Sequence, residues 1–223
     1  MSEQDATWLN APGSADFDNA SNWSSGAVPA GIATFDQSSV TALLFQASST
    51  TSVSTFVFNP DAPSYSFSLI GNITENGLQV PSLSFSNLGI INDSSFAPSF
   101  VITLGNLSFL NSSNAGNASF TISGVITSAG SIYDADLNFE NTSSAGSATI
   151  INNPDGGITN FYDSSTAGAA NVVNNFNVSF FGTSNAGTAK IANTAAEIIV
   201  NGNARSHLAP LYFLIPLRQQ MRQ

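Results

Sequence analysis

Apolar and polar residues alternate along most of this chain, and the alternation predicts β-strands. Tyr65, Phe67 and Leu69 are separated by single serines, and so are Leu107 and Phe109. Side chains two residues apart point to the same face of a strand, so each of these stretches presents one apolar face. No window of about a dozen residues carries an apolar stripe at helical spacing with recognisable caps. The pattern therefore predicts an all-β protein.

A repeated segment of 14 residues organises the second half of the chain. Its four copies begin at Leu107, Leu137, Thr159 and Val178, align without gaps and share the pattern F-x-x-[ST]-S-x-A-G-x-A-x-[FIV]. Successive Ala-Gly pairs are 30, 22 and 19 residues apart. A period of about 20 residues is typical of a solenoid, in which each repeat forms one turn. The residues that define the repeat are Phe109, Ala115, Gly116, Phe139, Ala145, Gly146, Phe161, Ala167, Gly168, Phe180, Ala186 and Gly187.

Each copy of the repeat contains two short strands joined by a corner. The glycine of each Ala-Gly pair can adopt the positive φ of a tight corner, and the small alanine before it lets successive corners stack closely. Strands this short cannot bury an apolar face alone, but parallel stacking builds a continuous core with Phe on Phe. The sequence thus predicts a single-domain parallel β-helix, or β-solenoid, with coils of about 20 residues.

Asparagine recurs after the second strand of three consecutive repeats. Asn152, Asn174 and Asn193 occupy corresponding places, and Asn153 and Asn175 follow the first two. Stacked asparagines can join successive coils through ladders of side-chain amides. Asparagine also tolerates left-handed turn conformations, which would explain the same pattern. The sequence leaves both interpretations open.

The composition argues against nucleic acids and membranes as partners. Only 8% of the residues are charged, and 14 Asp and Glu against 4 Lys and Arg give a net charge of −10. Such a chain cannot neutralise a phosphate backbone or dock to anionic lipid, so we expect no nucleic-acid binding. No apolar run reaches the roughly 18 residues of a membrane helix, so we expect no membrane insertion. The absence of Cys excludes disulfides, thiolate metal sites and Cys nucleophiles.

Carboxylates are the strongest candidates for catalysis. A glycosidase needs two carboxylates at a set separation, and Asp134 and Asp136, with Glu140 nearby, are predicted to share one face of a strand. A polysaccharide lyase needs a basic residue, and Lys190 is the only cation before residue 204. We favour the simpler interpretation that all of these residues are solvated on turns or outer strand faces. No catalytic residue is therefore predicted.

Metal sites and aromatic binding sites have equally little support. Asp16-x-Asp18 begins like a calcium loop but lacks the later Gly and bidentate Glu. His207, the only His, has no His or Cys partner. We therefore predict no metal and no cofactor, and the sequence identifies no ligand-binding residue. Trp8 and Trp23 are expected to shield the core of the first coil rather than to stack on sugars.

The beginning of the chain resembles the start of passenger regions in bacterial autotransporters. The matching elements are Trp8, Pro12-Gly13-Ser14, Asn22-Trp23, Val28-Pro29 and Ala33-Thr34-Phe35. The Ala-Gly repeats resemble those that follow in the same family, and the resemblance spans residues Ala6 to Asn203. It implies a right-handed parallel β-helix, displayed on or released from the outer membrane of a Gram-negative cell, and hence a cell-surface or extracellular location.

The C-terminal tail departs from that family. An autotransporter has a C-terminal β-barrel, for which the residues after 203 leave no room. Three of the four cations, Arg205, Arg218 and Arg222, lie in this tail. We expect either a cap over the last coil or a truncated or frame-shifted end. The chain is accordingly divided into an N-terminal cap (1–35), solenoid repeats (36–203) and an atypical tail (204–223).

The expected function is non-enzymatic. A passenger segment of this kind acts in adhesion or extended display, and glycans, a host surface or sister solenoids are the partners to test. The alternative is a polysaccharide-degrading β-helix, either a lyase or a glycosidase. An ice-binding solenoid would need a regular array of Thr, whereas these positions mix Ser, Thr and Asn. Met1 is followed by Glu3 and Asp5 without a basic or an apolar segment, so no signal peptide is visible.

Overall fold

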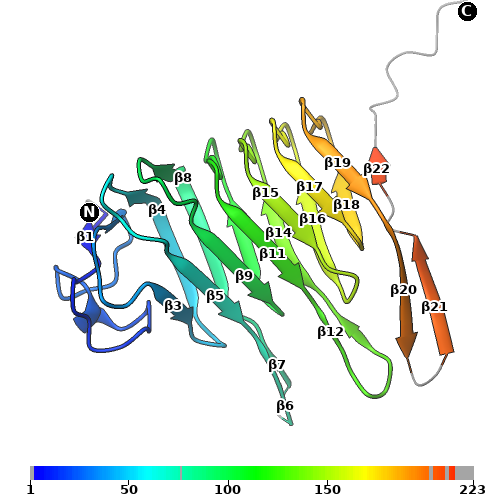
Figure 1. The fold of residues 1–223 in the computed structure, drawn as a ribbon, viewed down its shortest axis with the longest axis horizontal. Coiled ribbons are helices and arrows are strands. Elements are labelled where there is room, and N and C mark those ends of the chain that lie inside the picture. The colour runs from blue at the N-terminus through cyan, green and yellow to red at the C-terminus, as the bar shows by residue number, and fades with distance from the viewer. Residues whose placement is uncertain (1–2, 76, 201–202, 209–210, 214–223) are drawn as a thin grey trace, which may run out of the picture.

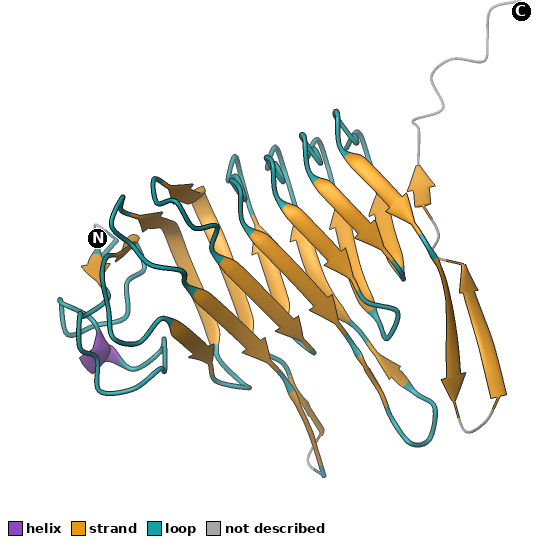
Figure 2. Cartoon of the chain, viewed as in Figure 1, coloured by secondary structure: helices purple, strands orange, loops and turns teal. Residues whose placement is uncertain are grey.

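The regular structure of the chain is almost entirely β (Figure 2). The computed structural model describes residues 3–75, 77–200, 203–208 and 211–213, with side chains as far as residue 194. Within this part the one helical element is a short 3-10 turn, Ala20–Asn22. The strands form two large sheets in which every pairing is parallel. The predicted all-β class with parallel strands is confirmed.

The chain passes back and forth between the two sheets (Figure 1). The nine-stranded sheet contains, in spatial order, β1 (Ala6–Thr7), β2 (Ile32–Phe35), β4 (Thr50–Phe58), β8 (Ser82–Asn92), β10 (Asn106–Phe109), β14 (Ala135–Phe139), β16 (Gly157–Phe161), β18 (Asn177–Phe180) and β22 (Leu211–Phe213). The seven-stranded sheet contains β3 (Ala42–Phe45), β5 (Ser66–Ile70), β9 (Ser99–Thr103), β11 (Ser119–Ser123), β15 (Thr149–Asn152), β17 (Asn171–Asn174) and β19 (Lys190–Asn193). Each sequence repeat thus supplies one strand to each sheet.

Phenylalanine rings stack in a column along the inner face of the nine-stranded sheet. Phe85, Phe109, Phe139, Phe161 and Phe180 occupy one row of the strand register. Neighbouring ring centroids are 4.8 to 5.0 Å apart, and neighbouring ring planes lie within 18° of each other. Such aromatic pairs contribute roughly 0.5–1.5 kcal/mol each beyond the apolar area that they bury. The predicted stacking of Phe on Phe is present.

The seven-stranded sheet supplies the opposite wall of the core. Phe67, Phe100 and Phe120 stack with centroid distances of 4.8 and 5.2 Å, and Ile150 and Val172 continue the same row. All five side chains are buried. The buried apolar side chains of both sheets belong to one continuous cluster, which neither row of strands could form alone.

Glycine corners connect the two strands of each repeat. The glycines at 116, 146, 168 and 187 have φ between +56° and +61°, as predicted. Each glycine N–H donates to a side-chain oxygen two residues earlier, at 2.7 to 3.1 Å. The acceptors are Asn114, Ser144, Thr166 and Asn185, which also form parallel bridges with one another from corner to corner. The corner is therefore a third line of contact between repeats.

A second left-handed position in the corner escaped the sequence analysis. Asn111, Asn141 and Asp163 have φ of +56°, +58° and +55°, and Gly182 has φ of +66°. The Asn111 N–H donates to Asn141 Oδ1 at 2.9 Å, and the Asn141 N–H donates to Asp163 Oδ2 at 2.8 Å. These residues lie two positions after the Phe of each repeat, and Asn, Asp and Gly are the residues that tolerate this conformation. That shared preference was the available signal.

An asparagine ladder runs through the interior. Asn152 and Asn174 are fully buried. The Asn152 Nδ2 donates to Asn174 Oδ1 at 3.2 Å, and the Asn174 Nδ2 donates to Asn193 Oδ1 at 2.9 Å. The buried amides are thus paired with one another, as burial of a polar group requires. This result confirms the amide-ladder interpretation for these three residues.

Insertions at a single corner explain the uneven spacing of the repeats. From each Phe to the inward residue of the next strand the distance is 11 residues in all four repeats, for example from Phe109 to Phe120. The opposite corner holds hairpins of different lengths, β6–β7 (Asn72–Thr74, Gly77–Gln79), β12–β13 (Val125–Ile126, Ile132–Tyr133) and β20–β21 (Ala195–Val200, Asn203–Leu208). All three project from the same edge of the molecule (Figure 1).

Aromatic side chains close the N-terminal end of the core. Trp8 and Trp23 are 1% and 2% exposed, and their rings meet edge to face at 5.1 Å. The Trp8 Nε1 donates to Val40 O at 3.0 Å, and the Trp23 Nε1 donates to Phe17 O at 2.8 Å. The Phe17 ring stacks on that of Phe45, with the ring centroids 4.6 Å apart. Phe45 belongs to β3, the first strand of the seven-stranded sheet. The tryptophans therefore shield the first repeat, as expected.

The backbone of the predicted tail is described only in part. Strand β21 pairs antiparallel with β20, and β22 adds to the nine-stranded sheet with Phe213 beside Phe180. The predicted boundary at residue 204 falls inside β21, and the one after residue 35 coincides with the end of β2. Arg218 and Arg222 lie outside the described residues. The division into three segments stays a prediction.

The stacked corners predict a large cost for a methyl group at Gly168. A Cβ there would lie 2.7 Å from the Gly146 carbonyl oxygen, whereas one at Gly26, also left-handed at +70°, would meet nothing within 4 Å. The conformation costs about 1–2 kcal/mol in either case, and overpacking adds about 1–3 kcal/mol. Urea denaturation should therefore give Gly168→Ala a lower free energy of unfolding than Gly26→Ala. Equal losses would contradict the close stacking.

The buried amide ladder predicts that two substitutions in β17 differ in their effect on the free energy of unfolding. Asn174→Ala removes partners from both neighbouring amides and should lower the free energy of unfolding by about 1–3 kcal/mol. Asn171→Ala changes an exposed outward side chain of the same strand and should stay within about 0.5 kcal/mol of the parent. Chemical denaturation of both variants measures the difference, and an equally mild effect at Asn174 would argue against a stabilising ladder.

Candidate functional site

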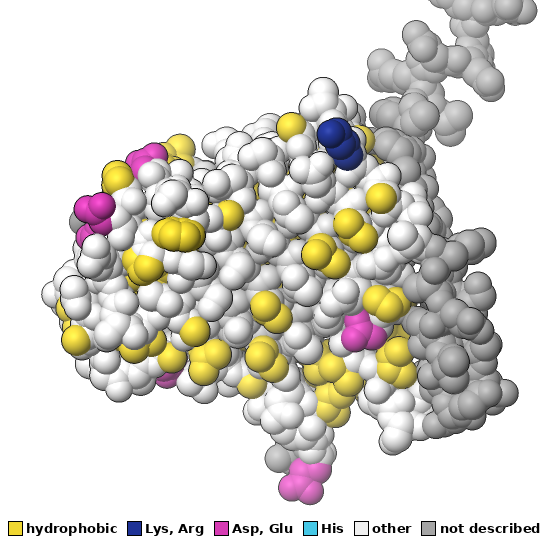
Figure 3. All heavy atoms as spheres, viewed as in Figure 1, with side chains coloured by type: hydrophobic (Ala, Val, Ile, Leu, Met, Phe, Trp, Pro, Cys, Tyr) yellow, Lys and Arg dark blue, Asp and Glu magenta, His cyan; other side chains and the backbone are white. Residues whose placement is uncertain are grey.

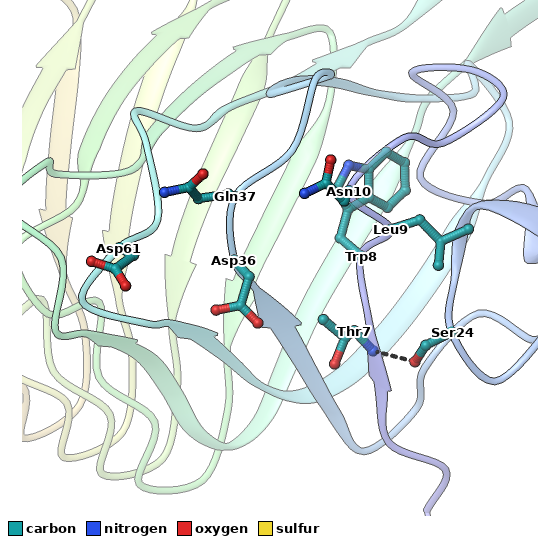
Figure 4. Close-up of a pocket in the computed structure, with 8 residues that line it drawn as sticks. All are labelled: Thr7, Trp8, Leu9, Asn10, Ser24, Asp36, Gln37 and Asp61. Atoms are coloured by element: carbon teal, nitrogen blue, oxygen red, sulfur yellow. Dashed lines mark hydrogen bonds between the residues drawn. The ribbon is translucent and has the colours of Figure 1, made fainter.

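A shallow hollow lies beside the N-terminal end of the nine-stranded sheet. Its volume is about 360 Å³, and its lining residues are Thr7, Trp8, Leu9, Asn10, Ser24, Asp36, Gln37 and Asp61. Figure 4 shows that Asp36 and Asp61 come from different connections of the chain. Six of the eight residues that line the hollow are polar and none is basic, and polar and apolar atoms share its surface about equally. It offers hydrogen-bonding groups for a neutral hydroxyl-rich ligand, but Trp8 is too buried to provide an open stacking face.

The two acids of the hollow have different surroundings. The Asp36 carboxylate accepts a hydrogen bond from Asn59 Nδ2 at 2.8 Å, and its backbone carbonyl accepts one from the Tyr65 hydroxyl at 2.6 Å. Burial, reinforced by the Asp36 charge, raises the pKa of Tyr65 to about 12. Tyr65 therefore stays protonated at neutral pH and donates this bond as part of the core. Asp61 forms no hydrogen bond with any residue in the described part of the chain.

The predicted carboxylate pair lies beside the β12–β13 hairpin. Asp136 points outward from β14, whereas Asp134 lies in the link between β13 and β14 rather than on the strand. Burial raises the pKa of Asp134. Burial and then the neighbouring Asp134 charge raise the pKa of Asp136, although Asn160 partly opposes this by donating to its Oδ1 at 3.4 Å. The Asp134 charge thus acts on Asp136, but the prediction that the two acids share one face of a strand is wrong, because Asp134 is not part of β14.

Neither acid of this pair is among the residues that line the hollow. Glu140 follows the end of β14. The pKa of Tyr162 is raised mainly by burial, and then by the charges of Asp136 and Glu140. Tyr162 stacks on Phe181 at 5.0 Å. Asp155 also has a pKa raised by burial. In the described part of the chain, no three His, Cys, Asp or Glu residues come together as a metal site would require.

The other sequence candidates occupy structural or outlying positions. The Asp16 carboxylate accepts from the Asp18 N–H at 3.0 Å and from Gln46 Nε2 at 3.1 Å, while Asp18 accepts from the Thr51 hydroxyl at 2.6 Å. These bonds tie the N-terminal segment to the sheets. Lys190 begins β19 and is exposed. The side chain of His207 lies outside the described residues.

The outward side chains of the seven-stranded sheet, which we term the seven-strand face, form two continuous rows. Uncharged side chains cover most of this face (Figure 3). The strand register aligns one row as Ala42, Ser66, Ser99, Ser119, Thr149, Asn171 and Lys190. It aligns the other as Leu44, Ser68, Val101, Thr121, Ile151, Val173 and Ala192. Neighbouring side chains of a row are spaced by the strand separation of about 4.8 Å.

This face combines small hydroxyl groups with exposed apolar side chains. Leu44, Val101 and Val173 are 47%, 40% and 40% exposed. Neither row contains an acidic residue, although the chain has 14 of them. The sequence had predicted alternation within each strand, but not that the outward residues of seven strands would align into one surface.

Comparison of the chain with protein-family models, with curated proteins and with solved structures found no match. Among the described residues, no helix has both the length and the hydropathy needed to cross a lipid bilayer.

The raised pKa of Asp136 predicts a pH-dependent loss of stability. Because its folded pKa lies above the ordinary value of 3.8, the folded chain holds the proton more tightly than the unfolded chain. This contribution to stability is complete below that ordinary value and disappears as the pH rises through the folded pKa. Asp136→Asn should therefore raise the free energy of unfolding at pH 7 and change it little at pH 3. Urea titrations at both pH values test this, and an equal effect at both would contradict it.

Proposed function

We propose that the two sheets are faces of one right-handed parallel β-helix with coils of about 20 residues, lengthened where hairpins are inserted. Three features support this arrangement: the alternation of the chain between the sheets, the parallel register, and the 11-residue corner that recurs in every repeat. Right-handed crossovers are the strong preference for parallel strands, and the resemblance to autotransporter passengers has the same implication.

The proposed function is non-enzymatic adhesion or extended display. The protein acts as a passenger-type rod at the surface of a Gram-negative cell or after release from it. The seven-strand face carries this proposal, because two rows of hydroxyl, amide and aliphatic side chains run across its seven strands, with Lys190 at one end as their single charge. Each contact of such a surface is weak, but contacts repeated along an extended ligand add by avidity. Glycans or a host surface are suitable ligands.

A polysaccharide-degrading enzyme is the second candidate. It is favoured by the coupled acids Asp134 and Asp136, because a raised carboxyl pKa is what a general acid needs. Neither acid lines the hollow described above, which supports the non-enzymatic proposal.

Adhesion predicts binding that depends on the seven-strand face. Beads coated with the full chain should adhere to one or more neutral surfaces of a glycan and matrix-protein array. Thr149→Glu places a charge on this face and should reduce the bound fraction several-fold, because many weakened contacts act together. Ser108→Glu places the same charge on an outward position of β10 in the other sheet and should leave adhesion unchanged. Absence of binding above background on every surface would overturn adhesion.

Enzymatic activity would be detected separately. We expect the full chain to release no reducing ends or unsaturated products from a panel of acidic and neutral polysaccharides. Release that disappears in Asp136→Asn, with the fold retained, would favour the second candidate over the first.

A further inference from the structure

We propose that the seven-strand face joins two copies of this chain, packed face to face about a two-fold axis that runs along β11. This inference rests on the proposed function, because it names a second copy of the chain as one partner of the same surface. Strand β11 is the middle strand of the seven. The axis is parallel to β11 and lies between the two faces. The two-fold rotation therefore places β9 over β15, β5 over β17 and β3 over β19 of the other copy.

The pattern of side chains on this face is nearly symmetric about β11. The rotation brings Val101 of one copy over Ile151 of the other, so that apolar side chains meet. It likewise brings Leu44 over Ala192 at the two ends of the same row. Thr121 lies on the axis and meets its own equivalent. Ser68 over Val173 is the one pair of this row that joins a hydroxyl to an aliphatic side chain. A two-fold interface needs a patch that is complementary to itself, and the other pairs of this row have that property.

The five inner positions of the other row pair polar groups with polar groups. Ser99 lies over Thr149, and Ser66 lies over Asn171, so hydroxyl groups face hydroxyl or amide groups. Neutral hydrogen-bonding side chains of this kind can pair across an interface without burying an uncompensated charge. The absence of acidic residues from both rows matters here, because a chain of net charge −10 otherwise repels its own copies.

Charges of opposite sign lie at the two ends of the face. Lys190 is on β19, the last strand, and Asp16 forms a parallel bridge with Leu44 beyond β3, the first strand. The two-fold rotation places Lys190 of each copy over Ala42 of the other, two residues along β3 from Leu44, the residue that Asp16 adjoins, and a long lysine side chain can span that offset. Two ion pairs related by symmetry would therefore flank the apolar and hydroxyl centre. Such complementarity fixes the orientation of the partners more than it adds affinity.

The size of the face sets the strength expected. Seven strands of four or five residues, spaced at about 4.8 Å with a rise of about 3.3 Å per residue, cover roughly 500 Å² per copy. The two copies together bury about 1,000 Å², which is the lower limit for a specific interface. The association should therefore be weak in solution and become significant where many copies are crowded on one surface.

Sedimentation velocity of the full chain over a range of concentrations tests this inference. We expect a reversible monomer–dimer equilibrium that weakens as salt increases, because the terminal ion pairs are exposed. Thr121→Lys sets two like charges against each other on the axis and should raise the dissociation constant at least about tenfold. Lys190→Glu should also raise it by removing both ion pairs. Ser108→Lys, on the outward face of β10, should leave it unchanged.

The outcomes separate this inference from the proposed function. A chain that stays monomeric up to about millimolar concentration, or a dimer weakened equally by Ser108→Lys, overturns the inference. If the array still binds the monomeric chain, the proposed adhesion stands without it. Dimerisation that is lost in Thr121→Lys, with thermal unfolding unchanged, supports the inference even where the array binds nothing.

Discussion

The structure depends on the close and regular approach of each repeat to its equivalent in the next one. Parallel strands lie about 4.8 Å apart, so side chains at equivalent strand positions of neighbouring repeats lie side by side. This spacing suits flat rings stacked face to face, as from Phe109 to Phe180. It leaves no room for a Cβ at Gly168 beside the Gly146 carbonyl. It also pairs the buried amides of Asn152 and Asn174. A substitution in one repeat therefore acts on its neighbours as well.

Much of this arrangement could be predicted from the sequence, because stacking forces the same residue types to recur. The alternating strands, the left-handed glycines such as Gly146 and the column of Phe rings all follow from positions that repeat in register. The asparagine ladder was one of two open interpretations, and only the inward direction of Asn152 and Asn174 decided between them. A repeated residue shows that a position is constrained, but not which neighbour imposes the constraint.

The features that the sequence analysis missed depend on contacts between segments that share no sequence pattern. The left-handed turn at Asn111, Asn141 and Asp163 was missed because these residues differ from Gly182 in type, although all tolerate the same conformation. The carboxylates were misplaced because Asp134 belongs to a hairpin link, and the sequence gives no sign of where β14 begins. The seven-strand face could not be foreseen at all, since it requires the register of all seven strands.

The position of the hairpins at one edge determines where such a chain can gain or lose residues during evolution. The 11-residue corner is fixed by ladders on both sides of it, whereas the opposite corner accepts nothing, a short link or a hairpin such as β12–β13 without disturbing the strands that flank it. Residues can therefore be gained or lost at that edge alone. Over generations, new loops would accumulate along this one edge of the two sheets while the strands keep their sequence, so the hairpin edge is where related chains should differ most in length.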